Sequence, residues 1–148
     1  MKVAVGSDHR GFQTKKLVME WLKENNHEAV DVGTDSEESC DYPDFAAAGA
    51  RLVHSSAVER AILICGTGMG MAVVANKFPG VYACVCHSDF ESVRIRQHNN
   101  ANCMCIPYQI GDRTLKKMLN DFTTIEFDGG RHERRIEKIK AIEDEFTS

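Results

Sequence analysis

The chain has 148 residues, of which 43% are hydrophobic and 27% are charged, close to the average for a globular protein. That length suits one compact domain with its own core, and the composition excludes a disordered or collagen-like chain. The formal net charge of −4 argues against a general nucleic-acid-binding protein, and no apolar run approaches the roughly 20 residues that cross a bilayer. Because Met1 leads directly into an apolar segment, there is no room for a signal peptide, and we expect a cytoplasmic protein.

Strand-like and helix-like segments alternate along the chain. Short apolar runs predict five strands, at residues 2–6, 28–32, 61–65, 81–86 and 102–106. Apolar residues at helical spacing, together with capping signals, predict helices at about residues 12–24, 43–53, 71–78, 88–98, 111–122 and 131–146. This alternation indicates an α/β fold whose parallel sheet is covered by helices on both faces. No repeat or linker interrupts it, so we expect one domain over residues 1–148.

Folds of this kind bind ligands beyond the carboxyl ends of their strands. The rule selects Asp8 and His9 after the first strand, residues 65–70 after the third, and the segment after the fourth. The helix that follows the fourth strand ends in residues 96–100. The end of that helix can return to the same rim only with help from a neighbouring element or subunit.

Three glycines at alternate positions, Gly66, Gly68 and Gly70, follow the third predicted strand. Such a loop lets backbone N–H groups approach an anion, and the helix after it adds its positive end. A dinucleotide-binding turn needs glycine where Met71 stands, and a P-loop needs a lysine with a hydroxyl neighbour, so both motifs fail on spacing. A tight strand-to-helix turn without a ligand is the alternative.

Cys65 immediately precedes this loop. A thiol beside backbone N–H donors and a helix N-terminus has its thiolate form favoured. The thiolate can serve as a nucleophile, which wants a nearby histidine that the sequence does not place, or as a general base. A base needs a second device that stabilises the negative charge developing on the substrate, and the loop N–H groups supply one. From Gly66 to Phe78 there is no carboxylate to compete for the base role.

Six motifs, in order along nearly the whole chain, carry a family resemblance. They are GSDHRGF at 6–12, DYP at 41–43, ICGTGMG at 64–70, ANK at 75–77, RQHN at 96–99 and GGRH at 129–132. Together they resemble the type B ribose-5-phosphate isomerases, within a wider sugar-phosphate isomerase family that includes the galactose-6-phosphate isomerase subunits. The resemblance implies a Rossmann-like three-layer sandwich without a nucleotide. It also implies a homodimer or dimer of dimers with active sites shared between subunits, and the helix at about 131–146 at the dimer interface.

The resemblance further implies an aldose–ketose isomerase of the pentose phosphate pathway. It would interconvert ribose 5-phosphate and ribulose 5-phosphate through a cis-enediolate, with Cys65 as the base and Thr67 assisting, while His98 is the acid that opens the furanose ring. The substrate-binding residues would be Asp8, His9, Tyr42, Gly66, Gly68, Met69, Gly70, Asn99, Arg131 and Arg135. The implied partner is a phosphorylated sugar, with no metal, organic cofactor, nucleic acid or membrane.

Three positions depart from the family pattern. Pro107 stands where the family usually has glycine, and Gln109 where it has a phosphate-contacting arginine. Losing that arginine removes a charge-assisted contact of about 1.5–3 kcal/mol, and Arg134 is an extra basic residue that is a candidate to compensate. The departures leave open another sugar phosphate, of tetrose, allose or galactose type. A non-catalytic phosphate- or nucleotide-binding α/β module is the alternative from another class.

Several of these residues also have plain structural interpretations. Asp8 can cap a helix, the end of the RQHN motif can cap another, and the Arg131–Arg135 cluster can be a solvated face. The C-x-C pairs at 84–86 and 103–105 lie on predicted strands, where alternate residues share a face, so we predict buried packing thiols rather than zinc ligands. We expect Cys40, in a polar loop, to be exposed, and we assign no role to His132.

Overall fold

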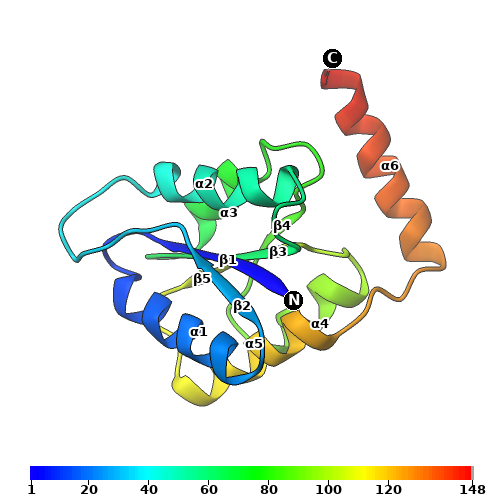
Figure 1. Ribbon diagram of the computed structural model, residues 1–148. Coiled ribbons are helices and arrows are strands. Elements are labelled where there is room, and N and C mark those ends of the chain that lie inside the picture. The colour runs from blue at the N-terminus through cyan, green and yellow to red at the C-terminus, as the bar shows by residue number, and fades with distance from the viewer. Residues whose placement is uncertain (148) are drawn as a thin grey trace.

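The structure is a computed structural model and describes residues 1–147. Its strands and helices alternate from β1 to β5 and end in two successive helices (Figure 1). The elements are β1 (Lys2–Ser7), α1 (Phe12–Glu24), β2 (Glu28–Asp31), α2 (Tyr42–His54), β3 (Arg60–Cys65), α3 (Met69–Ala75), β4 (Ala83–Val85), α4 (Asp89–Gln97), β5 (Cys103–Pro107), α5 (Asp112–Thr124) and α6 (Arg131–Phe146). The predicted fold class, an α/β fold with a five-stranded parallel sheet, is confirmed.

The strand order β2-β1-β3-β5-β4 reverses direction between β1 and β3. Such a switch point opens a crevice at the carboxyl ends of the strands, where ligands bind. The register pairs Ser7 of β1 with Ile64 of β3, and the N–H of Asp8 donates to the carbonyl of Ile64 at 3.1 Å. Asp8 and Cys65, the next residues along, are therefore neighbours at this rim.

Alternate residues of the central strands face opposite cores, because successive side chains of a strand point to opposite faces. In β3, Ile62 and Ile64 pack with α1, α4 and α5, whereas Leu63 and Cys65 pack with α2 and α3. Both cores are continuous and fully buried at their centres. The result is three layers, with helices on each side of the sheet (Figure 1).

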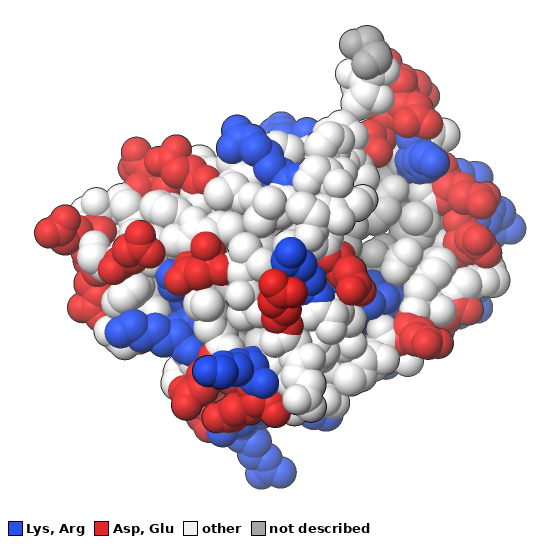
Figure 2. All heavy atoms as spheres, viewed as in Figure 1, with Lys and Arg blue, Asp and Glu red and all other residues white. Residues whose placement is uncertain are grey.

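Helix α6 lies outside these layers and extends away from them at the right of the view (Figure 1). Its apolar side chains Ile139, Ile142 and Phe146 are exposed, Phe146 by 84%. Together with residues 76–82 they line a groove of about 550 Å³, and uncharged atoms cover much of the hollow between α6 and the body (Figure 2). Across residues 1–147, no helix combines the length and the apolar character that crossing a membrane requires.

Most predicted bounds move by one to three residues in the structure, and at two elements the cause is visible. The strand predicted at 81–86 spans only Ala83–Val85, because the N–H of Tyr82 donates to the side chain of Asn102 at 2.8 Å instead of entering the ladder. The helix predicted at 71–78 is Met69–Ala75, and it begins directly after Gly68, whose φ of 80° makes the turn.

The start of α4 follows the predicted capping pattern. The Ser88 hydroxyl accepts from the N–H of Glu91 at 3.4 Å, and the Glu91 carboxylate accepts from the N–H of His87 at 2.9 Å. Two backbone donors that the helix itself cannot satisfy are thereby paired.

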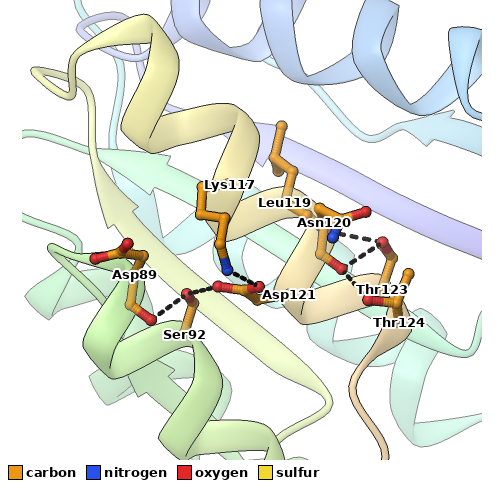
Figure 3. Close-up of polar contacts among 8 residues, drawn as sticks. All are labelled: Asp89, Ser92, Lys117, Leu119, Asn120, Asp121, Thr123 and Thr124. Carbon is orange, nitrogen blue, oxygen red and sulfur yellow. Dashed lines mark hydrogen bonds and ion pairs between the residues drawn. The ribbon is translucent and has the colours of Figure 1, made fainter.

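A buried carboxylate joins α4 to α5 (Figure 3). Asp121 on α5 is 2% exposed; it accepts from the Ser92 hydroxyl on α4 at 2.9 Å and pairs with the ammonium group of Lys117. Because a buried polar group without a partner is costly, this contact fixes how α4 lies on α5.

A buried guanidinium fixes the far end of α4. Arg96 is 4% exposed, and it donates to the carbonyls of Ile125 at 3.0 Å and Ala101 at 2.8 Å and to the side chain of Asn100 at 3.1 Å. Arg96 lies in the RQHN motif, so part of that motif is structural: it holds the end of α4 against the segment that follows α5.

We expect Asp121→Ala to lower the free energy of unfolding by about 1–3 kcal/mol, because it leaves the buried Ser92 hydroxyl without its interhelical partner. Urea denaturation followed by circular dichroism, at matched protein concentration, measures the change.

Asp112→Ala is the matched control, since Asp112 also pairs with a lysine four residues away on α5 but is exposed. An exposed pair of this kind contributes about 0.3–0.5 kcal/mol. Equal losses in the two variants would contradict the structural role of Asp121.

Candidate active site

A cleft of about 330 Å³ lies at the switch point between β1 and β3. It is lined by Asp8, Arg10, Tyr42, Cys65, Gly66, Thr67 and Gly70. Six of these seven are residues that the sequence analysis selected. The rim predicted from the strand pattern is therefore a real concavity, and the residues around it come from three separate parts of the chain.

Cys65 is the last residue of β3 and is 5% exposed. The N–H of Gly68 donates to its sulfur at 3.2 Å, and the N–H of Tyr108 donates to its carbonyl at 2.9 Å. The sulfur therefore has a backbone N–H donor beside it at the cleft. These two contacts hold the side chain and the backbone of Cys65 in place at the rim.

Two positions of the loop have no room for a side chain, and one of them also has a backbone conformation that favours glycine. A Cβ on Gly68 would lie 3.0 Å from the backbone of Cys105 and Ile106, and one on Gly70 would lie 2.4 Å from the ring of Tyr42. Glycine at these positions lets the loop lie against β5 and lets Tyr42 cover its end. The loop is thereby held where its Gly68 N–H reaches the sulfur.

Thr67 sits at the exposed tip of this loop. Its hydroxyl oxygen accepts from the N–H of Met69 at 3.1 Å, so the hydroxyl proton is directed elsewhere. Thr67 lines the cleft with Cys65, and it can donate to an oxygen atom bound there. Met69 itself is 57% exposed.

Asp8 does not cap α1, whose N-cap is Gly11, but its side chain holds the turn before that helix and also faces the cleft. Its Oδ1 accepts from the N–H groups of Arg10 at 3.0 Å and Gly11 at 3.1 Å, which holds the turn into α1. Asp8 is 7% exposed and contributes to the cleft lining. The position of the Asp8 side chain is thus set by the turn that it holds.

His9 is positioned by a residue that the sequence analysis set aside. The N–H of Cys40 donates to Nδ1 of His9 at 3.2 Å, and the Cys40 sulfur lies 3.8 Å from the same nitrogen. Because Nδ1 accepts, the neutral ring carries its proton on Nε2. The expectation that Cys40 is simply exposed is wrong: it is half-buried against His9.

Arg10 is a cleft residue to which the sequence analysis gave no role. Its side chain approaches to 3.7 Å from the position that a Cβ on Gly66 would occupy, so its cation lies over the glycine loop. The available signal was its place directly after the selected pair at residues 8–9. A fixed positive charge beside loop N–H groups favours an anionic ligand.

The remaining predicted site residues do not line this cleft. His98 caps the end of α4 and Arg131 begins α6. Helix α4 starts after the carboxyl end of β4 and runs back across the sheet. Its last residues therefore lie at the amino ends of the strands, the opposite edge of the sheet from the cleft. In Figure 1 the start of α2 lies at the left and α6 at the right. Asn99 and Arg135 belong to this second group.

Two imidazoles stack at that opposite edge. The rings of His98 and His132 are 4.3 Å apart at an interplanar angle of 10°, and His132 is only 9% exposed. Its burial, then the neighbouring His98 and the cations of Arg131 and Arg135, lower the pKa of His132. No role was predicted for His132, and a spacing of 34 residues in the sequence gives no sign of its contact with His98.

The four strand cysteines are packing residues, as predicted from their spacing. Cys86, Cys103 and Cys105 are buried, Cys84 is half-buried, and the sulfurs of Cys103 and Cys105 are 3.8 Å apart. Burial raises the pKa of Cys84 to about 11, so it is a neutral thiol at physiological pH. Cys65 differs from these four because it lines the cleft.

The profile of a protein family described as ribose/galactose isomerase matches residues 3–139 of the chain. The chain belongs to this family. Among ribose/galactose isomerases, it is 41% identical over 143 residues to ribose-5-phosphate isomerase B of Escherichia coli (strain K12), covering 96% of each chain. The resemblance drawn from the six motifs is confirmed, and the protein is a sugar phosphate isomerase of this family.

Two further relatives bear on the ligand. The chain is 42% identical over 142 residues to the 4-deoxy-4-sulfo-D-erythrose isomerase of Clostridium sp. (strain MSTE9), covering 95% of this chain and 89% of the relative. The structure of ribose-5-phosphate isomerase B from Mycoplasma genitalium with bound ribulose-5-phosphate is similar with a TM-score of 0.92 at 39% identity, covering 97% of each chain.

We expect Gly68→Ala to lower both stability and turnover, because the substitution meets the backbone of β5 and strains a left-handed residue. The strain alone is of order 1–2 kcal/mol. Thermal unfolding and steady-state kinetics measure the two losses.

Gly80→Ala isolates the contact, since Gly80 has nearly the same φ, 79°, with nothing within 4 Å of an added Cβ. Equal losses of stability and turnover in the two alanine variants would show that the loop does not depend on its close contact with β5.

Proposed function

We propose that the protein interconverts an aldose phosphate and a ketose phosphate, ribose 5-phosphate and ribulose 5-phosphate first, through a cis-enediolate with Cys65 as the base. The observation that carries this proposal is the Gly68 N–H donated to the Cys65 sulfur inside the cleft. A base and a set of anion-stabilising donors then stand on one loop. The family membership supports the same chemistry.

The reaction needs no oxidant, because it moves one proton from C2 to C1 and one from O2 to O1 within the same sugar. The thiolate of Cys65 removes the proton from C2 of the open-chain aldose, and the electron pair of that bond forms the C1–C2 double bond while O1 becomes anionic. The loop N–H groups and the Thr67 hydroxyl stabilise this charge. Within the cis-enediolate the O2 hydroxyl proton passes to O1, which leaves the negative charge on O2. The thiol then returns its proton to C1 as the C1–C2 double bond is lost and the C2–O2 double bond forms.

Different residues in and beside the cleft would contact different parts of the sugar phosphate. Asp8 and His9 would contact the sugar and its phosphate end, and Tyr42 would line the pocket over Gly70. Met69 and the glycines of the loop would complete the enediolate site. Arg10 adds a cation over the loop and would strengthen the binding of charged oxygens.

We further propose that a second copy of the chain completes the site. His98 would open the furanose ring, Asn99 would hold a sugar hydroxyl, and Arg131 with Arg135 would clamp the phosphate, all from the other subunit. Two observations support a homodimer or dimer of dimers. These groups lie at the opposite edge of the sheet from Cys65, and α6 exposes an apolar side that nothing in this chain covers within residues 1–147.

Two relatives of similar identity to this chain have different ligands. The Mycoplasma relative binds ribulose-5-phosphate, whereas the Clostridium relative is named for a four-carbon sulfonated sugar at similar identity. Gln109 is exposed here, and Pro107 pairs with Cys65 in the β3–β5 register, so both departures lie near the rim. A different sugar phosphate is therefore the second candidate. Comparing kcat/KM across tetrose, pentose and hexose phosphates separates them.

We also propose that the protein is located in the cytoplasm. All six cysteines are free thiols, four of them packed in or beside the sheet, which suits a reducing compartment such as the cytoplasm.

We expect Cys65→Ala to lower kcat by at least about 10²–10⁴-fold with the fold retained, because the proton-transfer group is lost. The assay follows ribose 5-phosphate isomerisation with excess chelator present, and circular dichroism checks the fold. Cys84→Ala, a thiol on β4 outside the cleft lining, is the control and should keep its activity. Full turnover in Cys65→Ala would rule out this base.

We expect two inactive variants to restore activity when they are mixed. Cys65→Ala and His98→Asn chains, denatured and refolded together, should recover about a quarter of the wild-type rate, since half of the dimers are mixed and each carries one intact site. Each variant refolded alone is the control. A mixture no more active than the average of its parts would place each complete site within one subunit.

A further inference from the structure

Three metal-ligating side chains meet where α4 ends and α6 begins. His98, Asp128 and His132 each offer a ligand atom, and these atoms all lie within 4.8 Å of one another. Among residues 1–147, no other group of three histidine, cysteine or acidic side chains has this geometry. The carboxylate is exposed, one imidazole is half-buried and the other is buried, so the group opens to solvent on one side.

The backbone holds the three residues in place before any ligand binds. The N–H of His98 donates to the carbonyl of Arg94 at 2.8 Å, that of Asp128 to Gln97 at 3.1 Å, and that of His132 to Gly129 at 3.0 Å. The bond from Asp128 ties the loop before α6 directly to the last turn of α4. The buried Arg96 holds the same junction through Ile125. Little ordering entropy would be lost on binding an ion.

Two imidazoles and one carboxylate form a donor set of the kind that holds zinc with a position left open. Zinc bonds to nitrogen and oxygen are about 2.0–2.2 Å long, so donors on one ion lie roughly 3–3.5 Å apart. The ligand atoms of the group lie within 4.8 Å of one another, and one of the two stacked imidazoles must turn out of the stack for both rings to face one ion. We propose that His98, Asp128 and His132 form a binding site for a divalent transition metal ion of the zinc class.

The charged residues around the site weaken cation binding, so we expect an ion that binds reversibly rather than a permanent structural ion. The guanidinium groups of Arg131 and Arg135 lie close enough to act on His132 electrostatically, and they repel a cation. The ion would also occupy His98. This consequence rests on the proposed function: a metal on the imidazole that opens the furanose ring inhibits the isomerase.

Cobalt(II) is the probe, because its absorption spectrum reports the ligand type. Titration of the purified full chain with cobalt(II) chloride, followed by calorimetry and visible absorption, should show one ion per chain with nitrogen and oxygen ligation and no thiolate charge-transfer band. Asp128→Asn and His132→Gln should each weaken binding at least about tenfold. Asp128 is exposed, so its variant should fold even where the buried His132 position does not tolerate glutamine.

His54→Gln is the matched control, since it removes an exposed imidazole on α2 and should leave the affinity unchanged. Binding that persists in Asp128→Asn and His132→Gln, or that shows a thiolate band, overturns the site.

A second arm measures inhibition. Zinc should inhibit the wild-type isomerase, reversibly with EDTA, and Asp128→Asn should need at least about tenfold more zinc relative to its own metal-free rate. Cobalt binding without any isomerase activity would support the metal site and refute the proposed function separately.

Discussion

Strand β3 is the constraint on which the rest of the site depends. Every residue from Ala61 to Cys65 is buried, so the strand cannot shift without disturbing both cores. Its register with β1 brings Asp8 to the rim beside Cys65, and its register with β5 leaves Gly68 in contact with the backbone of Cys105. The sulfur and its N–H donor are therefore positioned by the packing of three strands. A flexible loop alone would not keep that distance.

The parallel topology separates the chemical groups into two halves. Groups that follow strands collect at the carboxyl edge, whereas the last turn of α4 and the start of α6 are at the opposite edge. The second half has its own scaffold: Asp121 fixes α4 on α5, and Arg96 fixes the end of α4 against the chain that leads to Asp128. A scaffold of buried hydrogen-bonded charges is costly to assemble. This scaffold holds the region that we propose completes the cleft of another copy.

Most of the fold, and the half of the site built on loops after strands, follow from local patterns in the sequence. Alternating apolar runs and helical periods predict the parallel sheet, and the strand ends then predict where Asp8 and Cys65 meet. Element bounds were less accurate at β4 and α3. There, the side chain of Asn102 replaces a ladder contact and a left-handed Gly68 moves the helix start, and neither effect changes the hydrophobic pattern.

What the sequence could not show are contacts between polar side chains far apart in the chain. His98 and His132 stack across 34 residues, and Cys40 contacts His9 across 31. No periodicity links such pairs, because each residue obeys the rules of its own element. The RQHN motif illustrates the point: Arg96 is buried and structural, whereas His98, two positions later, is half-exposed and is the residue that we propose opens the furanose ring. Since side chains at that spacing point to different sides of a helix, one motif can serve the scaffold and the site at once.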